Sequence, residues 1–354
     1  MNTQLPSPVL GIRAFGALTN LGNSALQSAA SWIVQARRQH RVKLEGYADP
    51  ITLADRPDLT EGLEGTERLF ALLKSAVAEA LSDQPCPDTA SASLNILVLP
   101  KGLGETEQKQ LADRLAGFWP ESDVHFSTIT GNATAAWAAL DSAYEVLGAN
   151  PKLQQVVMVC VDSLCDPRRL YQAAEAAQLL QKGHSEGYVP GEAAVCLVMD
   201  RLRDVTELPA GGFALHRPAL AQQSEHWWPS ANQPDPQPLV IAITDALALA
   251  DMNPCHISHL LSDMDGSSWR AQIEAPAISR IILSEAGQLP HWKPASLFGQ
   301  IGTASAPLGW ILATLMHTRR IRQLNTLLNW SIDPAGKTAA CVMERAPKRD
   351  RQGK

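Results

Sequence analysis

Two stretches of the sequence, one in the middle and one near the end, decide the fold. Gly191-Glu-Ala-Ala-Val-Cys-Leu-Val-Met-Asp-Arg201 is similar to Gly336-Lys-Thr-Ala-Ala-Cys-Val-Met-Glu-Arg345 when a gap of one residue is allowed. Each string reads as a buried strand, and each follows an apolar strand and a small-residue helix. We therefore predict two similar α/β halves that close with the same strand, with a chance match between two short strands as the alternative.

The segments around these strings alternate between strand-like and helix-like patterns. Apolar runs predict strands at 8–22 with its turn, 95–99, 124–127, 155–161, 193–199, 257–261, 280–283, 325–332 and 338–343. Helical spacing predicts helices at 24–38, 64–81, 105–118, 131–147, 166–181 and 302–317, whereas 239–250 is ambiguous. Residues 131–147 and 302–317 carry few charges, so both helices should be buried. The alternation predicts an α/β fold.

The boundaries of the halves follow from this alternation. We predict an N-terminal half at 1–205, a connection rich in Pro and Trp at 206–238, a C-terminal half at 239–346 and a basic tail at 347–354. The connection carries the adjacent residues Trp227 and Trp228 in a polar loop. Two adjacent tryptophans in a polar loop either form a docking patch for a protein partner or, slightly more in keeping with the pattern, cover the chain's own core.

The composition excludes several classes of protein. The 354 residues are 45% hydrophobic and 19% charged, which is too apolar for a disordered chain. A net charge of −6 argues against general binding of nucleic acid. No run approaches the ~20 apolar residues of a membrane helix, and the first residues lack a secretory pattern, so we expect a cytoplasmic protein. The six scattered cysteines include no Cys-x-x-Cys pair and are expected to be reduced and buried.

Specific strings extend these patterns to a known family. Gly187-Tyr-Val-Pro-Gly-Glu-Ala-Ala-Val195 is similar to the Gly-Phe-x-x-Gly-Glu-Gly-Ala-Ala string of β-ketoacyl-acyl-carrier-protein synthases. Residues 9–22 resemble that family's first strand and turn, and Thr66-Glu-Arg68 resembles the start of its next helix. Gly302-Thr-Ala-Ser-Ala-Pro-Leu-Gly309 matches the spacing Gly-His-x-x-x-Ala-x-Gly. The resemblance implies the α/β, thiolase-like fold, with two pseudo-duplicated halves, buried central helices and a homodimer.

The same resemblance implies that the condensing chemistry is lost. These enzymes need a nucleophilic cysteine at the start of the first buried helix, and Thr130 takes its place within a register margin of a couple of residues. The family's two histidines fall on the region of Asp265 and on Thr303, and its lysine falls on Phe298. A carboxylate repels a developing oxyanion, which an imidazole donor would stabilise. We expect no catalytic residue and no cofactor, only vestigial positions.

Three other patterns have a functional and an ordinary interpretation. Cys255-His-Ile-Ser-His259 suggests a metal site, but zinc needs three or four ligands, so we predict no metal. Asp263 and Asp265 form either an acid–base pair or an Asp-x-Asp-Gly-Ser turn, and the turn is the commoner arrangement. His125 and His184 are candidates for the old pocket, with surface or satisfied core positions as the alternative.

These observations predict an eroded ketosynthase-like protein that acts as an accessory or adaptor by binding another protein. Thiolase-like proteins encoded with type VI secretion systems resemble this chain, which implies a secretion effector or its adaptor as the partner. Two alternatives remain. One is an enzyme that transfers or hydrolyses acyl groups from acyl carrier protein or coenzyme A with a hydroxyl such as that of Thr130. The other is a non-catalytic partner subunit of an active synthase.

Overall fold

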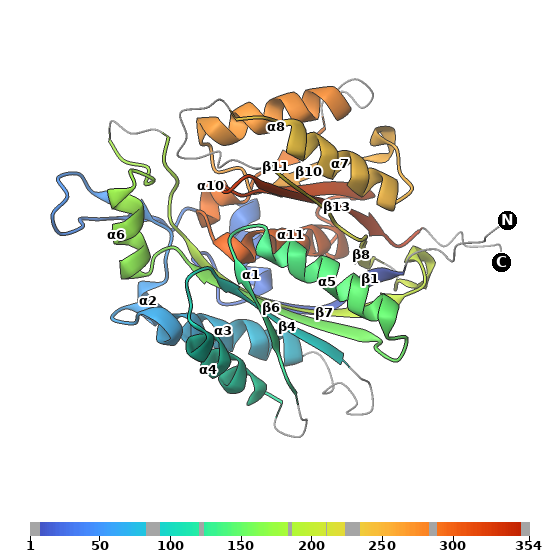
Figure 1. The fold of residues 1–354 in the computed structure, drawn as a ribbon, viewed down its shortest axis with the longest axis horizontal. Coiled ribbons are helices and arrows are strands. Elements are labelled where there is room, and N and C mark those ends of the chain that lie inside the picture. The colour runs from blue at the N-terminus through green and yellow to red at the C-terminus, as the bar shows by residue number, and fades with distance from the viewer. Residues whose placement is uncertain are drawn as a thin grey trace.

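Eleven strands form one continuous mixed sheet that is folded into two parts with helices between and outside them, and two short strands pair in a separate sheet (Figure 1). The computed structural model describes residues 8–82, 93–119, 124–182, 186–209, 211–223, 234–282 and 289–347. The strand order is β11-β10-β12-β13-β8-β1-β7-β6-β4-β5, and β9 pairs with β13 outside this path. None of the helices in these ranges is long and apolar enough to cross a membrane.

The first half is built on a five-strand pattern. Its elements are β1 (Val9–Thr19), α3 (Gly65–Ser82), β4 (Ser93–Pro100), α4 (Glu105–Ala116), β5 (Ser127–Gly131), α5 (Ala135–Ala149), β6 (Gln155–Ser163) and β7 (Glu192–Leu202). β7 pairs antiparallel with β1 and with β6, whereas β4 pairs parallel with β6 and with β5. The α3 and α4 helices cover one face of this sheet, and α5 lies on the other (Figure 1).

The second half repeats this pattern element by element. Its elements are β9 (Ala219–Gln222), α7 (Gln237–Leu249), β10 (His259–Ser262), α8 (Ser268–Ile281), β11 (His291–Trp292), α11 (Ser305–Thr318), β12 (Thr326–Ile332) and β13 (Lys337–Arg345). β13 pairs antiparallel with β9 and β12, and β10 pairs parallel with β12 and β11. The two similar sequence strings therefore form β7 and β13, which occupy equivalent places. This confirms the prediction of pseudo-duplicated halves.

The two central helices, α5 and α11, meet between the halves. Eleven of the fourteen residues of α11 are buried, as the lack of charged side chains predicts. Trp137 of α5 and Trp310 of α11 are fully buried and pack edge to face, with ring centroids 5.3 Å apart. Such a pair contributes about 1 kcal/mol beyond the burial of its area. The core between the halves therefore depends on both helices at once.

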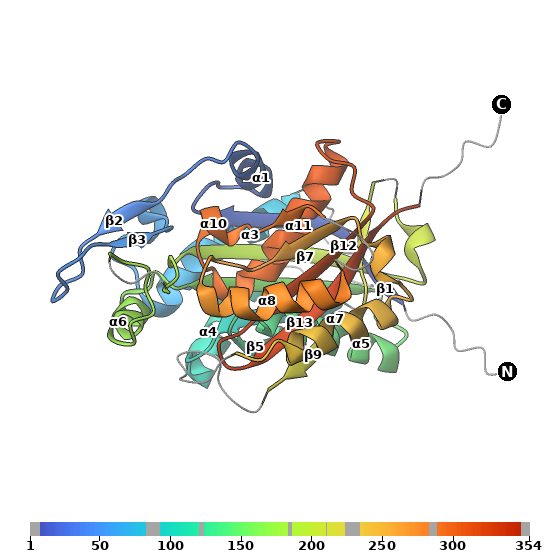
Figure 2. The same ribbon diagram turned by 90° about the horizontal axis from the view of Figure 1, so that it is seen from above.

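Smaller elements surround this frame, and Figure 2 shows them from above. They are α1 (Ala25–Ile33), β2 (His40–Val42), β3 (Ile51–Leu53), α2 (Pro57–Thr60), α6 (Pro167–Glu175), η1 (Val205–Glu207), β8 (Phe213–Leu215), η2 (Pro254–His256), α10 (Ala295–Phe298) and η3 (Gly302–Ala304). The predicted connection at 206–238 thus contains two strands, because β8 and β9 pair with β13. Trp227, Trp228 and residues 348–354 of the tail lie outside the described residues.

Several expected boundaries need correction. Residues 280–282 of the strand expected at 280–283 instead end and cap α8, because the apolar Ile281 and Ile282 pack on the core from a helix and its cap, and residue 283 lies outside the described residues. The ambiguous run at 239–250 is the helix α7. The strand expected at 124–127 begins only at Ser127, and the expected helices 24–38 and 166–181 end at Ile33 and Glu175. The domain boundaries themselves stay a prediction.

Candidate functional site

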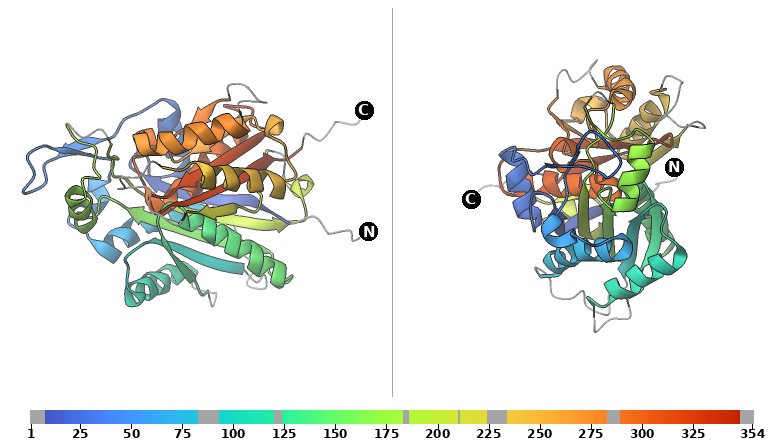
Figure 3. Two further views of the ribbon diagram at one scale, coloured as in Figure 1. Left: turned by 45° about the horizontal axis from the view of Figure 1, so that its top comes forward. Right: turned by 90° about the vertical axis from the view of Figure 1, so that its left-hand side faces the viewer.

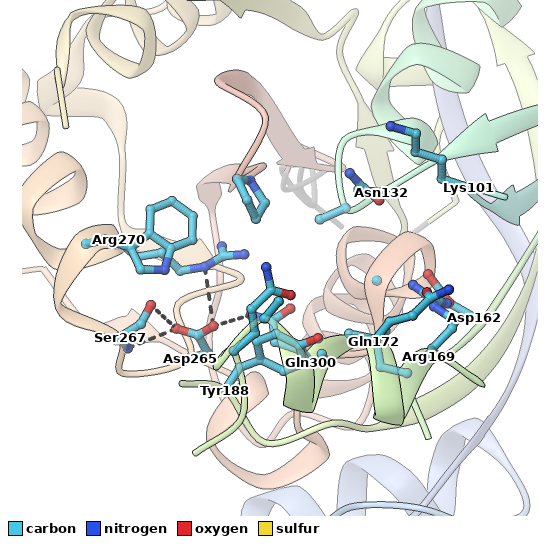
Figure 4. Close-up of a pocket in the computed structure, with 18 of the residues that line it drawn as sticks. Lys101, Asn132, Asp162, Arg169, Gln172, Tyr188, Asp265, Ser267, Arg270 and Gln300 are labelled. Carbon is cyan, nitrogen blue, oxygen red and sulfur yellow. Dashed lines mark hydrogen bonds and ion pairs between the residues drawn. The ribbon is translucent and has the colours of Figure 1, made fainter. Parts of the chain in front are cut away.

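A cavity of about 460 Å³ lies where loops of both halves meet. Its wall includes the turn before α5, the loop after β10, the start of η3 and the helix α6, which covers one side. In Figure 4, Lys101 and Asn132 lie on one side of this cavity, and Asp265, Ser267 and Arg270 lie on another. Amide and charged side chains outnumber apolar ones in the wall, although more of the wall's surface is apolar than polar.

The turn before α5 presents an amide to the cavity. Asn132 lines the wall, and its Nδ2 donates to Asp333 Oδ1 at 3.2 Å. The hydroxyl of Thr134 donates to the other oxygen of Asp333 at 3.4 Å. Asp333 is 2% exposed and comes from the turn between β12 and β13, so the second half holds the start of the first half's helix. Carboxylates are favourable at this end of a helix.

Thr130 occupies a different place from the one expected of it. It lies in β5 opposite Leu99, its side chain is exposed, and it is not part of the cavity wall. The strand continues through Gly131, so the turn to the helix begins at Asn132, two residues later. Asn132 is therefore the side chain near the start of α5 that reaches the cavity, within the register margin that the sequence left open.

Asp265 lines the cavity within a closed hydrogen-bond network (Figure 4). Its Oδ1 accepts from the backbone N–H of Ser267 at 2.9 Å and from the Ser267 hydroxyl at 2.6 Å. Its Oδ2 accepts from Gln300 Nε2 at 2.9 Å and lies 3.3 Å from Arg270 Nε. These contacts form the turn that the Asp-x-Asp-Gly-Ser pattern favours. The carboxylate is occupied by its own surroundings.

Asp263 is buried behind Asp265 and shares the same arginine. Arg270 Nη1 lies 2.9 Å from Asp263 Oδ1, and both side chains are less than 5% exposed. Burial raises the pKa of Asp263 to about 6, and the charge of Arg270 opposes this shift. Because one guanidinium serves both carboxyls, the pair fits a structural ion cluster better than an acid–base couple.

The start of η3 and α11 is packed tightly against a second carboxylate. Thr303 is fully buried, its backbone N–H donates to Asp162 Oδ2 at 3.1 Å, and its hydroxyl donates to the carbonyl of Val161 at 3.0 Å. Gly302 has a φ of +52°, and a Cβ there would lie 1.8 Å from Asp162 Oδ2. Asp162 also accepts from Arg169 Nη1, which comes from α6. Thr303 thus lies just behind the cavity wall, with both its donors engaged.

Phe298 lies apart from the other expected positions. Its side chain is fully buried in the central core, and it lines a small internal void rather than the main cavity. Of the four vestigial positions, the structure brings Asp265 to the cavity and Thr303 directly behind it. Thr130 and Phe298 are not brought there.

Comparisons with solved structures show which fold this chain shares. No family model and no curated protein matches the chain. A type II PKS acyl-carrier protein in complex with its ketosynthase is similar with a TM-score of 0.78 at 14% identity, over 97% of this chain and 100% of that chain. A ketosynthase in complex with its chain length factor from Xenorhabdus doucetiae is similar with a TM-score of 0.73 at 16% identity, over 98% of this chain and 100% of that chain. The ketosynthase from module 6 of the bacillaene synthase from Bacillus subtilis 168 is similar with a TM-score of 0.76 at 13% identity, over 96% of this chain and 72% of that chain. The chain has the thiolase-like ketosynthase fold.

The motif strings of this ketosynthase-like chain form a buried ion pair that sequence analysis did not predict. Glu192, from the Gly-Glu-Ala-Ala string, is fully buried and accepts from Arg68 Nε at 2.8 Å. It also accepts from the hydroxyls of Ser163 and Thr60 and from the backbone N–H of Arg56. The sequence signal that could have predicted this pair is that one of the two strings contains an acidic residue and the other a basic residue. The ion pair itself is part of the frame, whereas Tyr188 of the first string lines the cavity.

The five thiols among the described residues lie away from the cavity wall. Cys160 and Cys165 are buried, and burial raises the pKa of both well above the usual thiol value. Cys255 is exposed near His256, yet no group of three or more potential ligands is placed to hold a metal among the described residues. His125 lies in an exposed groove beside α4, and His184 lies outside the described residues. The described part of the wall contains neither cysteine nor histidine.

Proposed function

We propose that this chain is a non-catalytic, ketosynthase-like protein that acts by binding another protein. The proposal rests on which side chains lie at the turn before α5. A thiolate in the place of Asn132 would face Asp333 at hydrogen-bond distance, and a neighbouring carboxylate disfavours the charged form of a thiol. The site has therefore lost the nucleophile and also carries a carboxylate that opposes one.

The environment on the opposite side of the cavity supports the same proposal. An oxyanion is stabilised by donors that are free to point at it. Here Ser267 and Gln300 donate to Asp265, and the backbone N–H of Thr303 donates to Asp162. These three donors beside the cavity are thus already engaged within the protein. A secretion effector or its adaptor is the partner class that the type VI resemblance suggests.

A second candidate is a partner subunit of an active synthase, and the edge strand β5 favours it. β5 pairs with β4 on one side, and no described strand covers its other edge. Three of the similar structures contain a ketosynthase together with a chain length factor. An open edge accepts a strand from a second subunit, either a copy of this chain or a synthase. The acyl-transfer alternative has less support, because Thr130 is outside the cavity wall.

One experiment tests these candidates together. The purified chain is incubated with malonyl-loaded and acyl-loaded acyl carrier protein, and carbon dioxide release and protein-bound acyl groups are measured, with an active ketosynthase as positive control. We expect no turnover and no adduct above the protein-free background. Turnover, or an adduct that disappears in Thr130→Ala or Asn132→Ala, would overturn the proposal. A stable mixed dimer on co-expression with a synthase would select the second candidate.

The partner itself is sought with the tagged full chain in its native extract. A protein that co-purifies in equal amounts is produced separately, and its complex with the chain is reconstituted from the two pure proteins. We expect a stoichiometric complex that forms without acyl substrates. Trp227→Ala/Trp228→Ala tests the docking patch predicted from the sequence and should weaken this complex without unfolding the chain. Unchanged affinity would exclude that patch.

A further inference from the structure

The helix α1 has an apolar face on its solvent side. It buries Trp32 and several small residues against the body of the protein. Its opposite face carries Leu26, Ala30, Ile33 and Val34, at the i, i+4, i+7 and i+8 spacing that places side chains on one side of a helix. Leu26 is 46% and Val34 is 72% exposed. An apolar stripe of this kind is typical of a face that another molecule covers.

A basic segment follows this helix directly. Arg37, Arg38, Arg41 and Lys43 are all exposed within residues 37–43. Arg38 lies 3.4 Å from Asp58, whereas the other three form no ion pair with any described residue. The segment is fixed in position, because Gln39 Nε2 donates to the carbonyl of Leu297 at 3.3 Å. Three of the four cations that follow the apolar helix thus have no ion-pair partner among the described residues.

A second basic segment lies at the end of α11, against which α1 packs. Arg319, Arg320 and Arg322 are exposed, and Ile321 between them is 46% exposed. Figure 2 shows the end of α11 and the helix α1 on the same edge of the molecule. Within residues 319–322, no arginine forms an ion pair with a described residue. The apolar stripe is thus bordered by cations from two separate parts of the chain.

Aromatic contacts connect α1 with the strands β10 and β11. Trp32 of α1 packs edge to face on Trp292, with centroids 5.3 Å apart, and His259 contacts Trp292 at the same distance. Burial lowers the pKa of His259, and the charge of Arg322 lowers it further. Lys293 follows Trp292 and is exposed. Trp292 thus links α1 to His259, which lies near Arg322.

We infer that the exposed face of α1, with segments 37–43 and 319–322, is a docking surface for an acidic amphipathic segment of a partner protein. The inference rests on the proposed protein-binding function and adds the place and the chemistry of the contact. The chain as a whole carries a net charge of −6, so this cluster of cations stands out from its background. Its complement is a segment with carboxylates around a few apolar side chains.

The side chains favour a protein over a lipid surface. Most of the cations are arginines, whose planar guanidinium pairs with carboxylates in a bidentate way and which are enriched at protein interfaces. Membrane-binding surfaces place aromatic residues at the water interface, whereas Trp32 is only 8% exposed beneath α1. A lipid surface is therefore an alternative outcome of the test.

The test measures binding of a labelled peptide of about 20 residues to the full chain by fluorescence anisotropy. The peptide is a designed helix with leucines at i, i+3 and i+7 and glutamates elsewhere. We expect Arg319→Glu/Arg322→Glu to weaken binding about tenfold or more at low salt, and Ile33→Ser/Val34→Ser to weaken it about as much. Raising the salt from about 50 mM to about 300 mM should weaken wild-type binding and have less effect on the arginine variant.

The matched control is Lys109→Glu/Lys152→Glu, which makes the same change in net charge at two exposed positions. Lys109 is on α4, on the opposite side of the molecule from α1 (Figure 3). An equal loss in this control, no peptide binding at about 100 µM, or variant-sensitive binding of phosphatidylglycerol vesicles in place of the peptide would each overturn the inference. If the reconstituted natural partner binds the arginine variant as well as the wild type, this surface is excluded while the protein-binding function stands.

Discussion

The two buried helices begin in different ways, although they occupy equivalent places in the two halves. At α11, Asp162 is fully buried, accepts a backbone N–H at 3.1 Å, pairs with Arg169 and leaves no room for a side chain at Gly302. At α5, Asp333 accepts from two side chains at 3.2 and 3.4 Å, and Asn132 faces the open cavity. The start of α11 is locked, whereas the start of α5 is loosely held.

The comparison teaches that both contacts cross between the halves. Asp162 lies near the end of β6 in the first half and reaches the start of the buried helix of the second half. Asp333 follows the equivalent strand β12 and reaches the helix of the first half. The two carboxylates therefore join the halves beside the cavity, and each of them holds the start of one buried helix.

The largest expected effect is at the locked start. Gly302→Ala would place a Cβ 1.8 Å from Asp162 Oδ2 at a backbone φ of +52°, so the turn or the carboxylate must move. We expect a loss of about 4 kcal/mol in the free energy of unfolding. Denaturant unfolding followed by circular dichroism measures it. The control is Gly148→Ala in α5, where no atom lies within 4 Å of the new Cβ, and its effect should be slightly stabilising.

Removing the charge of Asp162 should lower the free energy of unfolding more than removing the charge of Asp333. Asp162→Asn removes the charge from a buried contact with Arg169, and we expect a loss of about 3 kcal/mol, since an unpaired charge next to a buried site is costly. Asp333→Asn keeps polar contacts of ordinary length and should cost about 1 kcal/mol. Urea midpoints of the two variants give both values. Equal losses would show that the two helix starts are held alike.

The outer helices of the two halves also differ, because the buried face of α8 contains charged side chains, whereas the buried face of α4 is apolar. Glu274 of α8 accepts from Trp330 Nε1 at 3.0 Å, and burial raises its pKa to about 7. Since the folded state binds this proton more tightly than the unfolded state does, stability is fully present below pH ~4.5 and falls as the pH rises to about 7. We expect a loss of about 2 kcal/mol over this window.

Glu274→Gln removes the titration and should flatten stability between pH 4.5 and pH 7. Unfolding midpoints at several pH values measure the slope in both proteins. The exposed variant Glu145→Gln is the control and should keep the wild-type slope, because its side chain is 65% exposed. A slope that survives in Glu274→Gln would assign the pH dependence to another group, such as Asp263.

Much of the frame follows from local patterns in the sequence. The repeated strings at Gly191 and Gly336 predict equivalent strands, and the absence of charge in residues 302–317 predicts a buried helix, because both depend only on neighbouring residues. The end of α8 is mispredicted as a strand, since Ile281 and Ile282 have strand propensity and Pro276 interrupts the helical pattern. Tertiary packing overrides this preference.

The candidate site is less predictable because its contacts join distant residues. The Asp265 turn follows from five consecutive residues, and the sequence predicts it. The contact of Asn132 with Asp333 spans 201 positions, and that of Arg68 with Glu192 spans 124. No local pattern encodes such pairs. The register at Thr130 depended on where β5 ends, and strand ends are set by pairing with a neighbour, here β4.

The smallest predicted effect tests the loosely held start of α5 by thiol chemistry. In Asn132→Cys, the new thiol faces Asp333, so its thiolate is disfavoured and its alkylation by iodoacetamide at pH 7 should be slow. Adding Asp333→Asn should speed alkylation about tenfold, which corresponds to a fall of about one unit in the pKa of the thiol. Peptide-level mass spectrometry separates this site from the exposed Cys255. Thr130→Cys is the matched control, because its side chain is exposed on β5 and should react equally fast with either residue at 333. A rate at Asn132→Cys that does not depend on residue 333 would show that Asp333 holds the helix without controlling the charge of the site, and the loss of the nucleophile would then need no electrostatic cause.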